Sequence, residues 1–178
     1  MELYHVLNRG VEKRQIFMDT RDHARFVHDL YEFNDKTPAE NTRRRLEMTD
    51  FVNTSLREKI VDIHGWCLMK NHYHLLLSEH VEGGLTLFIR KLNVGYANYF
   101  NERYKRNGSL FLGTTKKIRI TSDGHFLHIL HYIHLNPLDF LKSAQDWRMR
   151  NIMSAMAALK YLEEYRWSSY PDYCGKKN

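Results

Sequence analysis

The chain has 178 residues, 43% of them hydrophobic and 27% charged, with 27 Lys and Arg against 21 Asp and Glu for a net charge of +6. This length suits a single domain over residues 1–178. The aromatic content of 13%, with only three Pro, excludes a disordered or fibrous chain. No apolar run approaches the ~20 residues of a membrane span, and residues 1–10 lack the apolar stretch of a signal peptide. We therefore expect neither a membrane protein nor a secreted one.

Cysteine content and charge narrow the cellular setting. The two cysteines, Cys67 and Cys174, lie far apart and show no metal-ligand spacing. Without a secretory signal they are expected to be reduced, which predicts a cytoplasmic protein. Nucleic acid is the commonest large anion there, so the positive charge is consistent with a nucleic-acid partner. A solvated basic surface without a partner is equally consistent with the charge alone.

The N-terminal third predicts a strand, a helix and a polar segment. Residues 3–8 alternate and are rich in strand formers, and the run ends at Gly10. Apolar residues recur at helical spacing over 20–34. Residues 35–59 contain a proline and three consecutive arginines but little apolar periodicity. We expect a polar excursion there and assign it no role.

The middle of the chain predicts a hairpin and a long helix. Two apolar runs, 60–69 and 72–77, flank the polar pair Lys70-Asn71, a pattern typical of an antiparallel hairpin. Lys-Asn is not a favoured hairpin dipeptide, so the pattern leaves the turn type open. An amphipathic helix is expected over 85–104.

The remaining elements complete the predicted architecture. A strand over 116–121 precedes a helix over 123–135, which the following Asn-Pro stops. A C-terminal helix near 151–164 and an aromatic tail over 165–170 make up the end of the chain, 150–178. This order predicts an α+β fold with a central antiparallel sheet flanked by helices.

The pair His72 and His74 is the first candidate site. Side chains two apart on a strand point to the same face, so both imidazoles would project together. That arrangement suits a divalent metal, although a third ligand must then come from elsewhere. Two unlinked histidines on a solvated strand face are the alternative.

A second candidate lies on the helix over 123–135. Tyr132 and Asn136 are four residues apart and are therefore neighbours on one helix face. A tyrosine beside an amide oxygen could supply a nucleophile and a third metal ligand. In the other interpretation, Tyr132 is a half-buried core aromatic and Asn136 merely ends the helix.

Basic residues are concentrated between 101 and 120, where six cations face a single acid, Glu102. Aromatic residues interleave with them. Cations can follow a phosphate backbone while aromatic faces stack on unpaired bases, which is the chemistry of single-strand binding. A solvated helix end and loop is the alternative. The candidate DNA-binding residues are Arg103, Lys105, Arg106, Lys116, Lys117 and Arg119.

Five sequence segments together resemble a known family. They are "YHVLNRGVEKRQIF", "GWCLMKNHYHLLL", "NYFNERYKRNGSLF", "YIHLNP" and "YRWSSY", and they span roughly residues 4–170 in order. They resemble the single-tyrosine HUH transposases of small bacterial insertion sequences, in particular the REP-associated tyrosine transposases. The His pair within M-x-N-H-x-H, followed by YIHLNP, is the specific part of this resemblance.

The resemblance implies a ferredoxin-like or RRM-like fold and assigns roles to the candidate residues. His72 and His74 match the metal ligands of the family, and Tyr132 matches its helical tyrosine nucleophile. Asn136 matches the proposed third ligand, at a position where related enzymes often carry Gln. Tyr96 is a competing tyrosine, but it lacks both the partner four residues on and the Y-I-x-x-N-P setting. A homodimer is also expected, and the sequence leaves open whether each site combines residues of one subunit or two.

The same resemblance implies a metal-dependent transposase that cleaves and rejoins single-stranded DNA near hairpin repeats. Tyr132 would form a 5′-phosphotyrosine and release a 3′-hydroxyl. The expected metal is Mg²⁺ or Mn²⁺, because phosphate oxygens, an amide and water are hard ligands. Two other functions stay open. One is a non-catalytic, domesticated transposase that binds nucleic acid, and the other is a metal-dependent phosphodiesterase that uses water.

Overall fold

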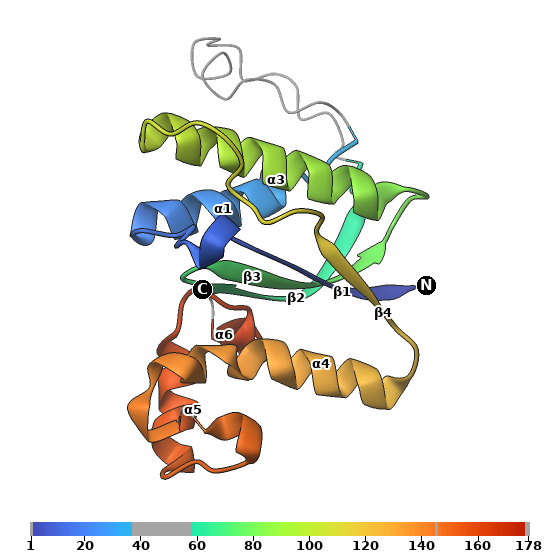
Figure 1. The fold of residues 1–178 in the computed structure, drawn as a ribbon. Coiled ribbons are helices and arrows are strands. Elements are labelled where there is room, and N and C mark those ends of the chain that lie inside the picture. Colours follow the sequence, from blue (N-terminus) through green and yellow to red (C-terminus); the bar gives the residue numbers. More distant parts are fainter. Residues whose placement is uncertain (1, 37–57, 145, 177–178) are drawn as a thin grey trace.

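A four-stranded antiparallel sheet forms the centre of the protein (Figure 1). The computed structural model describes residues 2–36, 58–144 and 146–176. The spatial order of the strands is β2-β3-β1-β4. Helices lie on both faces of the sheet, which confirms the predicted α+β class (Figure 1). The strands are β1 (Leu3–Arg9), β2 (Val61–Met69), β3 (His72–Glu79) and β4 (Lys116–Ile120).

The helices form two layers. Two of them cover one face of the sheet, α1 (Thr20–Glu32) and α3 (Gly84–Arg103). The other face carries α4 (Asp123–Leu135), with α5 (Ala155–Glu164) and α6 (Tyr170–Tyr173) beyond it (Figure 1). Short 3-10 turns complete the described chain: η1 (Val11–Lys13), η2 (Asn136–Phe140), η3 (Lys142–Ala144) and η4 (Trp147–Met149).

Most predicted elements occur with small shifts at their ends. The helix expected over 123–135 has those bounds. The C-terminal helix begins later than predicted, at Ala155, and the aromatic tail contains the short helix α6. Of the expected polar excursion, residues 37–57 lie outside the described part of the chain. No helix within the described ranges is long and apolar enough to cross a membrane.

Strand β3 is buried on both faces, which explains its apolar sequence. Tyr73, Leu75 and Leu77 point toward α1 and α3, where they join a large core. His74 and Leu76 point to the opposite face, toward α4. All five side chains are at most 3% exposed. A strand covered on both sides reads as a continuous apolar run rather than an alternating one.

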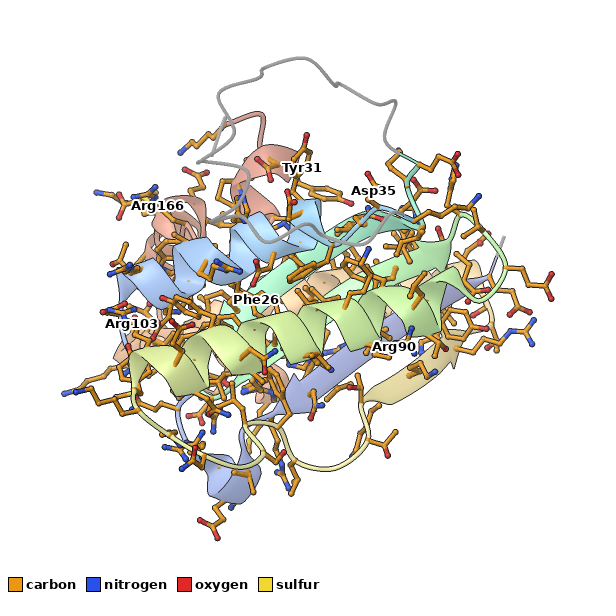
Figure 2. The ribbon with its side chains drawn as sticks, turned by 90° about the horizontal axis from the view of Figure 1, so that it is seen from above. Phe26, Tyr31, Asp35, Arg90, Arg103 and Arg166 are labelled. Carbon is orange, nitrogen blue, oxygen red and sulfur yellow. The ribbon has the colours of Figure 1, made fainter. Side chains whose placement is uncertain are left out.

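The two cores differ in composition. The larger one, between the sheet and α1 and α3, contains the buried aromatic rings of Phe26, Phe88 and Tyr96. Phe26, labelled in Figure 2, projects from α1 into this layer. Burying each phenylalanine contributes roughly 1.5–3 kcal/mol. The smaller core, under α4, is formed mainly by aliphatic and sulfur-containing residues, and two of them, Cys67 and Met69, pair with His74 and His72 across β2 and β3.

The turn between β2 and β3 forms although its dipeptide, Lys70-Asn71, is not one that favours hairpin turns. Met69 pairs with His72, which leaves Lys70 and Asn71 as a two-residue loop. Neither takes a positive φ, so the loop is not one of the glycine-rich hairpin turns. The segment after β1 supports it instead, since the Gly10 N–H donates to the Asn71 carbonyl at 2.8 Å and the Ile16 N–H donates to the Lys70 carbonyl at 2.9 Å. The turn is therefore fixed by tertiary hydrogen bonds.

The aromatic tail covers the outer edge of β2. The Leu68 N–H donates to the Trp167 carbonyl at 2.8 Å, and the Ser169 N–H donates to the Trp66 carbonyl at 2.9 Å. Ser168 forms a bridge to Cys67 in the same stretch. The tail thus pairs with an edge that would otherwise expose its backbone groups.

Candidate active site

The two histidines of β3 lie together on the face toward α4. The ring centroids of His72 and His74 are 4.9 Å apart, with planes at 88°. His74 is 3% exposed, whereas His72 is half-buried. The spacing of two residues on a strand therefore brings both imidazoles to one place, at the end of the sheet next to the β2–β3 turn.

Tyr132 reaches this place from α4 of the same chain. Its ring centroid is 5.5 Å from that of His74 and 6.1 Å from that of His5, both in edge-on arrangements. The tyrosine is half-buried, so its ring packs in the site without being sealed in the core. The histidine pair and the tyrosine thus meet within one chain.

His5, on β1, is a third imidazole in the site. Its Nε2 lies 2.9 Å from Nδ1 of His74 in a buried hydrogen bond, and the two rings stack at 5.1 Å. Burial lowers the pKa of His5 to about 4, so it is neutral at pH 7. The outer nitrogens of this pair, Nδ1 of His5 and Nε2 of His74, are buried without a hydrogen-bond partner. Such groups cost about 1–3 kcal/mol each.

The imidazoles fit a divalent metal ion in number and protonation. Burial lowers the pKa of both His72 and His74, which keeps them neutral with a lone pair available. Nδ1 of His72 donates to Oδ1 of Asn71 at 2.7 Å, which leaves the lone pair on its Nε2. The buried, unpartnered Nε2 of His74 is the atom that a metal would satisfy. In the part of the chain that is described, no group of three His, Cys, Asp or Glu residues is arranged to hold a metal, so His72 and His74 would supply two of its ligands.

Asn136 is buried where α4 ends. Its amide Nδ2 donates to the Tyr132 carbonyl at 2.7 Å, and its Oδ1 accepts from Nη2 of Arg148 at 3.0 Å. The Asn136 side chain therefore closes the last turn of α4 and contacts Arg148, which lies over the ring of Tyr132. An amide oxygen has a second lone pair, so the predicted role as a metal ligand is chemically open and stays a prediction.

Arg148 and Asp139 lie beside Tyr132 and were missed by the sequence analysis. The Arg148 guanidinium lies 5.7 Å from the centroid of the Tyr132 ring and forms an ion pair with Asp139. The bond to Asp139 raises the pKa of Arg148, and the Tyr132 hydroxyl adds to this effect. Both residues lie in the turns after α4, where no periodic pattern marks a functional position.

Tyr96, the competing tyrosine, lies on the opposite side of the sheet. It is 0% exposed in the core between α1 and α3, and its hydroxyl donates to the Ile16 carbonyl at 2.6 Å. Burial raises its pKa above the usual range. Tyr96 is thus a structural residue with no access to the histidine pair.

The predicted DNA-binding residues fall into two groups, of which the first lies at the end of α3. Arg103 forms ion pairs with Asp19 and with the fully buried Asp22, which joins the ends of α1 and α3 (Figure 2). Nη1 of Arg106 donates to Oδ1 of Asn101 at 2.7 Å. The neighbouring Lys105 has a positive φ of 49°. Arg103 therefore has a structural role that the sequence did not indicate.

The second group, on β4, is divided between the two faces of the sheet. Lys116 pairs with Leu7, which pairs with His74, so Lys116 shares the face of the histidines. Lys117 points the other way and donates to Oγ1 of Thr86 on α3 at 3.1 Å. Arg119 lies on that same face and forms an ion pair with Glu2. Lys116 is thus the member of the predicted set that strand register places beside the site.

Arg9 is a further cation on the face of the histidines. It is exposed and pairs directly with His72 across β1 and β3. It escaped the sequence analysis because cross-strand neighbours depend on register, which a single strand does not reveal.

An antiparallel sheet with paired imidazoles and a facing tyrosine is the arrangement that the sequence resemblance to single-tyrosine transposases leads us to expect. A model of the family described as "Transposase IS200 like" matches residues 4–136, and the chain belongs to this family. The matched range includes the histidine pair, Tyr132 and Asn136.

A solved structure has a similar fold over nearly the whole chain. It is described as "Structure of the REP associates tyrosine transposase bound to a REP hairpin", and the alignment covers 98% of this chain and 79% of the other at a TM-score of 0.54 and 10% sequence identity. A similarity at this identity establishes the fold. The search of curated proteins found no match.

Proposed function

We propose that this transposase cleaves and rejoins single-stranded DNA beside hairpin repeats, with Tyr132 as the nucleophile. The observation that carries the proposal is the position of Tyr132, half-buried and 5.5 Å from the His74 ring within one chain. The similar structure contains a REP hairpin, which supports a hairpin substrate for this chain as well. The expected homodimer is not needed to bring the histidines and the tyrosine together.

The reaction exchanges one phosphate ester for another. The Tyr132 oxygen forms a bond to phosphorus as the P–O3′ bond breaks, which leaves a 5′-phosphotyrosine. The phenol loses its proton and the departing 3′ oxygen gains one. A 3′-hydroxyl of another DNA end reverses these steps and joins the strands without an external energy source.

His72 and His74 would hold a Mg²⁺ or Mn²⁺ ion, with Asn136 as the proposed oxygen ligand. When bound, the ion would draw negative charge from the scissile phosphate and orient it. His5 supports this arrangement, because its neutral Nε2 accepts the Nδ1 proton of His74 and thereby leaves the Nε2 lone pair of His74 free. Lys116 and Arg9, on the same face, would contact the DNA backbone near the site.

The test is the formation of a covalent adduct. Purified protein is incubated with Mn²⁺ and single-stranded oligonucleotides that each contain a hairpin and a flanking single strand, labelled at the 3′ end. The 5′-phosphotyrosine keeps the 3′ part of the DNA on the protein, so the label should move with the protein under denaturing conditions. Tyr132→Phe should abolish this band, whereas Tyr96→Phe should retain it.

The same assay separates the alternatives. A persistent adduct with Tyr132→Phe would refute the assignment of the nucleophile. Cleavage without any adduct would indicate that water is the nucleophile, and hairpin binding without cleavage would indicate a non-catalytic protein. Adduct formation that survives the combined change of His72 and His74 to Ala would remove the metal from the mechanism.

A further inference from the structure

Arg148 lies beside Tyr132 and outside the part of the chain that matches the family model. It lies in η4, directly after Trp147, and its guanidinium is 4.4 Å from the centroid of the Trp147 ring and 5.7 Å from that of Tyr132. The family match ends at residue 136. The rings of Trp147 and Tyr132 are themselves neighbours, with centroids 5.9 Å apart, so the positive charge lies over both rings on one side, at the candidate active site.

Three hydrogen bonds that it donates to two residues fix the orientation of this guanidinium. Its two terminal nitrogens donate to the two oxygens of Asp139, with Nη2 to Oδ2 at 3.0 Å, and Nη2 also donates to Oδ1 of Asn136 at 3.0 Å. Asp139 is held in turn by the Trp147 indole, whose Nε1 donates to Oδ1 at 2.8 Å. This network extends from the end of α4 to η4, and it restricts a side chain that would otherwise be mobile.

The guanidinium keeps capacity for a ligand. An arginine has five N–H donors, and three of them are used in these bonds. The side chain is 43% exposed, and the Tyr132 hydroxyl is close enough to contribute to the raised pKa of Arg148, so the part of the guanidinium outside this network lies toward the tyrosine and solvent. A planar cation with fixed, unused donors next to a nucleophile is the arrangement that recognises a phosphate oxygen.

We propose that Arg148 binds a non-bridging oxygen of the scissile phosphate beside Tyr132, and that Asp139 and Asn136 position it. This inference rests on the proposed function, in which Tyr132 attacks that phosphate. Arg148 then neutralises the charge that increases on the phosphate as the Tyr132 oxygen approaches. Asn136 contributes to the site through Arg148, whether or not it also binds a metal.

The experiment measures single-turnover adduct formation with saturating hairpin DNA and Mn²⁺. Arg148→Gln should slow this step by about 10²–10³-fold, the usual loss on removal of one donor to a developing oxyanion. The matched control is Arg150→Gln, an exposed arginine two residues away, which should react at the wild-type rate. Asp139→Asn should slow the reaction to a smaller extent, because it loosens Arg148 without removing it.

A substrate with a neutral methylphosphonate at the scissile position distinguishes phosphate binding from a structural role. With no negative charge to neutralise, wild type and Arg148→Gln should react at similar rates. Equal slowing on both substrates would overturn the proposal, as would a wild-type rate for Arg148→Gln on the natural phosphate. If wild type does not cleave the methylphosphonate, a rescue experiment on the natural phosphate replaces this comparison. Added guanidinium ion should restore part of the reaction rate of Arg148→Ala, and the absence of any rescue would refute the proposal.

Separate control experiments test whether each variant folds and whether the proposed function itself holds. Thermal melts show whether each variant folds, and Arg148→Lys, which keeps the charge, should react faster than Arg148→Gln. A wild-type protein that forms no Tyr132 adduct would refute the proposed function, whereas a wild-type adduct unaffected by Arg148→Gln would refute this inference alone.

Discussion

His5→Phe tests whether the third imidazole serves the metal ligands. The change keeps a ring of similar size in a buried position but removes the Nε2 atom that lies 2.9 Å from Nδ1 of His74. His74 then loses the acceptor that holds its proton on Nδ1. Removal of such a supporting group usually lowers metal affinity 10–100-fold, or about 1.4–2.8 kcal/mol.

The effect on folding should be much smaller. The variant leaves Nδ1 of His74 unpaired, at a cost of about 1–3 kcal/mol. It also removes Nδ1 of His5, which is already buried without a partner and costs a similar amount. The two contributions nearly cancel, so the free energy of unfolding should change by no more than about 1 kcal/mol.

The assay is Mn²⁺ titration monitored by electron paramagnetic resonance, in the presence of hairpin DNA. A Tyr132→Phe background prevents cleavage during the measurement. His5→Gln, which offers an amide oxygen as acceptor, should recover part of the affinity lost in His5→Phe. Unchanged Mn²⁺ affinity in His5→Phe would refute the reasoning, and lost stability with unchanged affinity would assign His5 to the core.

Two further predictions concern acid stability and DNA contacts. Burial lowers the pKa of His134 from 6.5 to about 4, so the unfolded chain binds more protons than the folded one, and the free energy of unfolding decreases as the pH falls from about 6.5 toward 4. Urea melts of the wild type should therefore show a lower free energy of unfolding at about pH 5 than at about pH 7.5, and His134→Gln should reduce this difference by about 2 kcal/mol. Lys116→Ala should reduce the salt dependence of single-strand binding, measured by fluorescence anisotropy, by about 0.7 in the log–log slope. Arg103→Ala should leave that slope unchanged and lower Tm, because the buried Asp22 loses its ion-pair partner; the opposite pattern would place the DNA on the α1–α3 side.

Local patterns predicted the elements that depend on local forces. The helix over 123–135 has a serine N-cap, since the Ser122 hydroxyl accepts from the His125 N–H at 3.2 Å, and Pro137 follows its end. The β2–β3 hairpin followed from two apolar runs, although its turn depends on hydrogen bonds from a distant segment. The placement of His72 and His74 on one face could be predicted for the same reason, because the two-residue period of a strand is a local property.

The rest of the site depends on register and on packing between distant segments. His5 meets His74 because β1 pairs with β3, a contact between residues 69 positions apart. Arg148 reaches Tyr132 through turns that have no repeating pattern. Clustering in sequence also did not reveal that Arg103 is held by a pair of aspartates, on α1 and at its N-cap, on the other side of the sheet from Lys116.

The covered edge of β2 has a consequence for how the protein can be shortened or fused. The segment from Trp167 to Ser169 acts as a surrogate fifth strand, because its backbone satisfies groups of β2 that would otherwise be open to another chain. The opposite edge, β4, is a five-residue strand with three cations, features that discourage strand addition. A truncation after α5 would expose a long apolar edge and favour aggregation, whereas a tag attached after α6 leaves it protected.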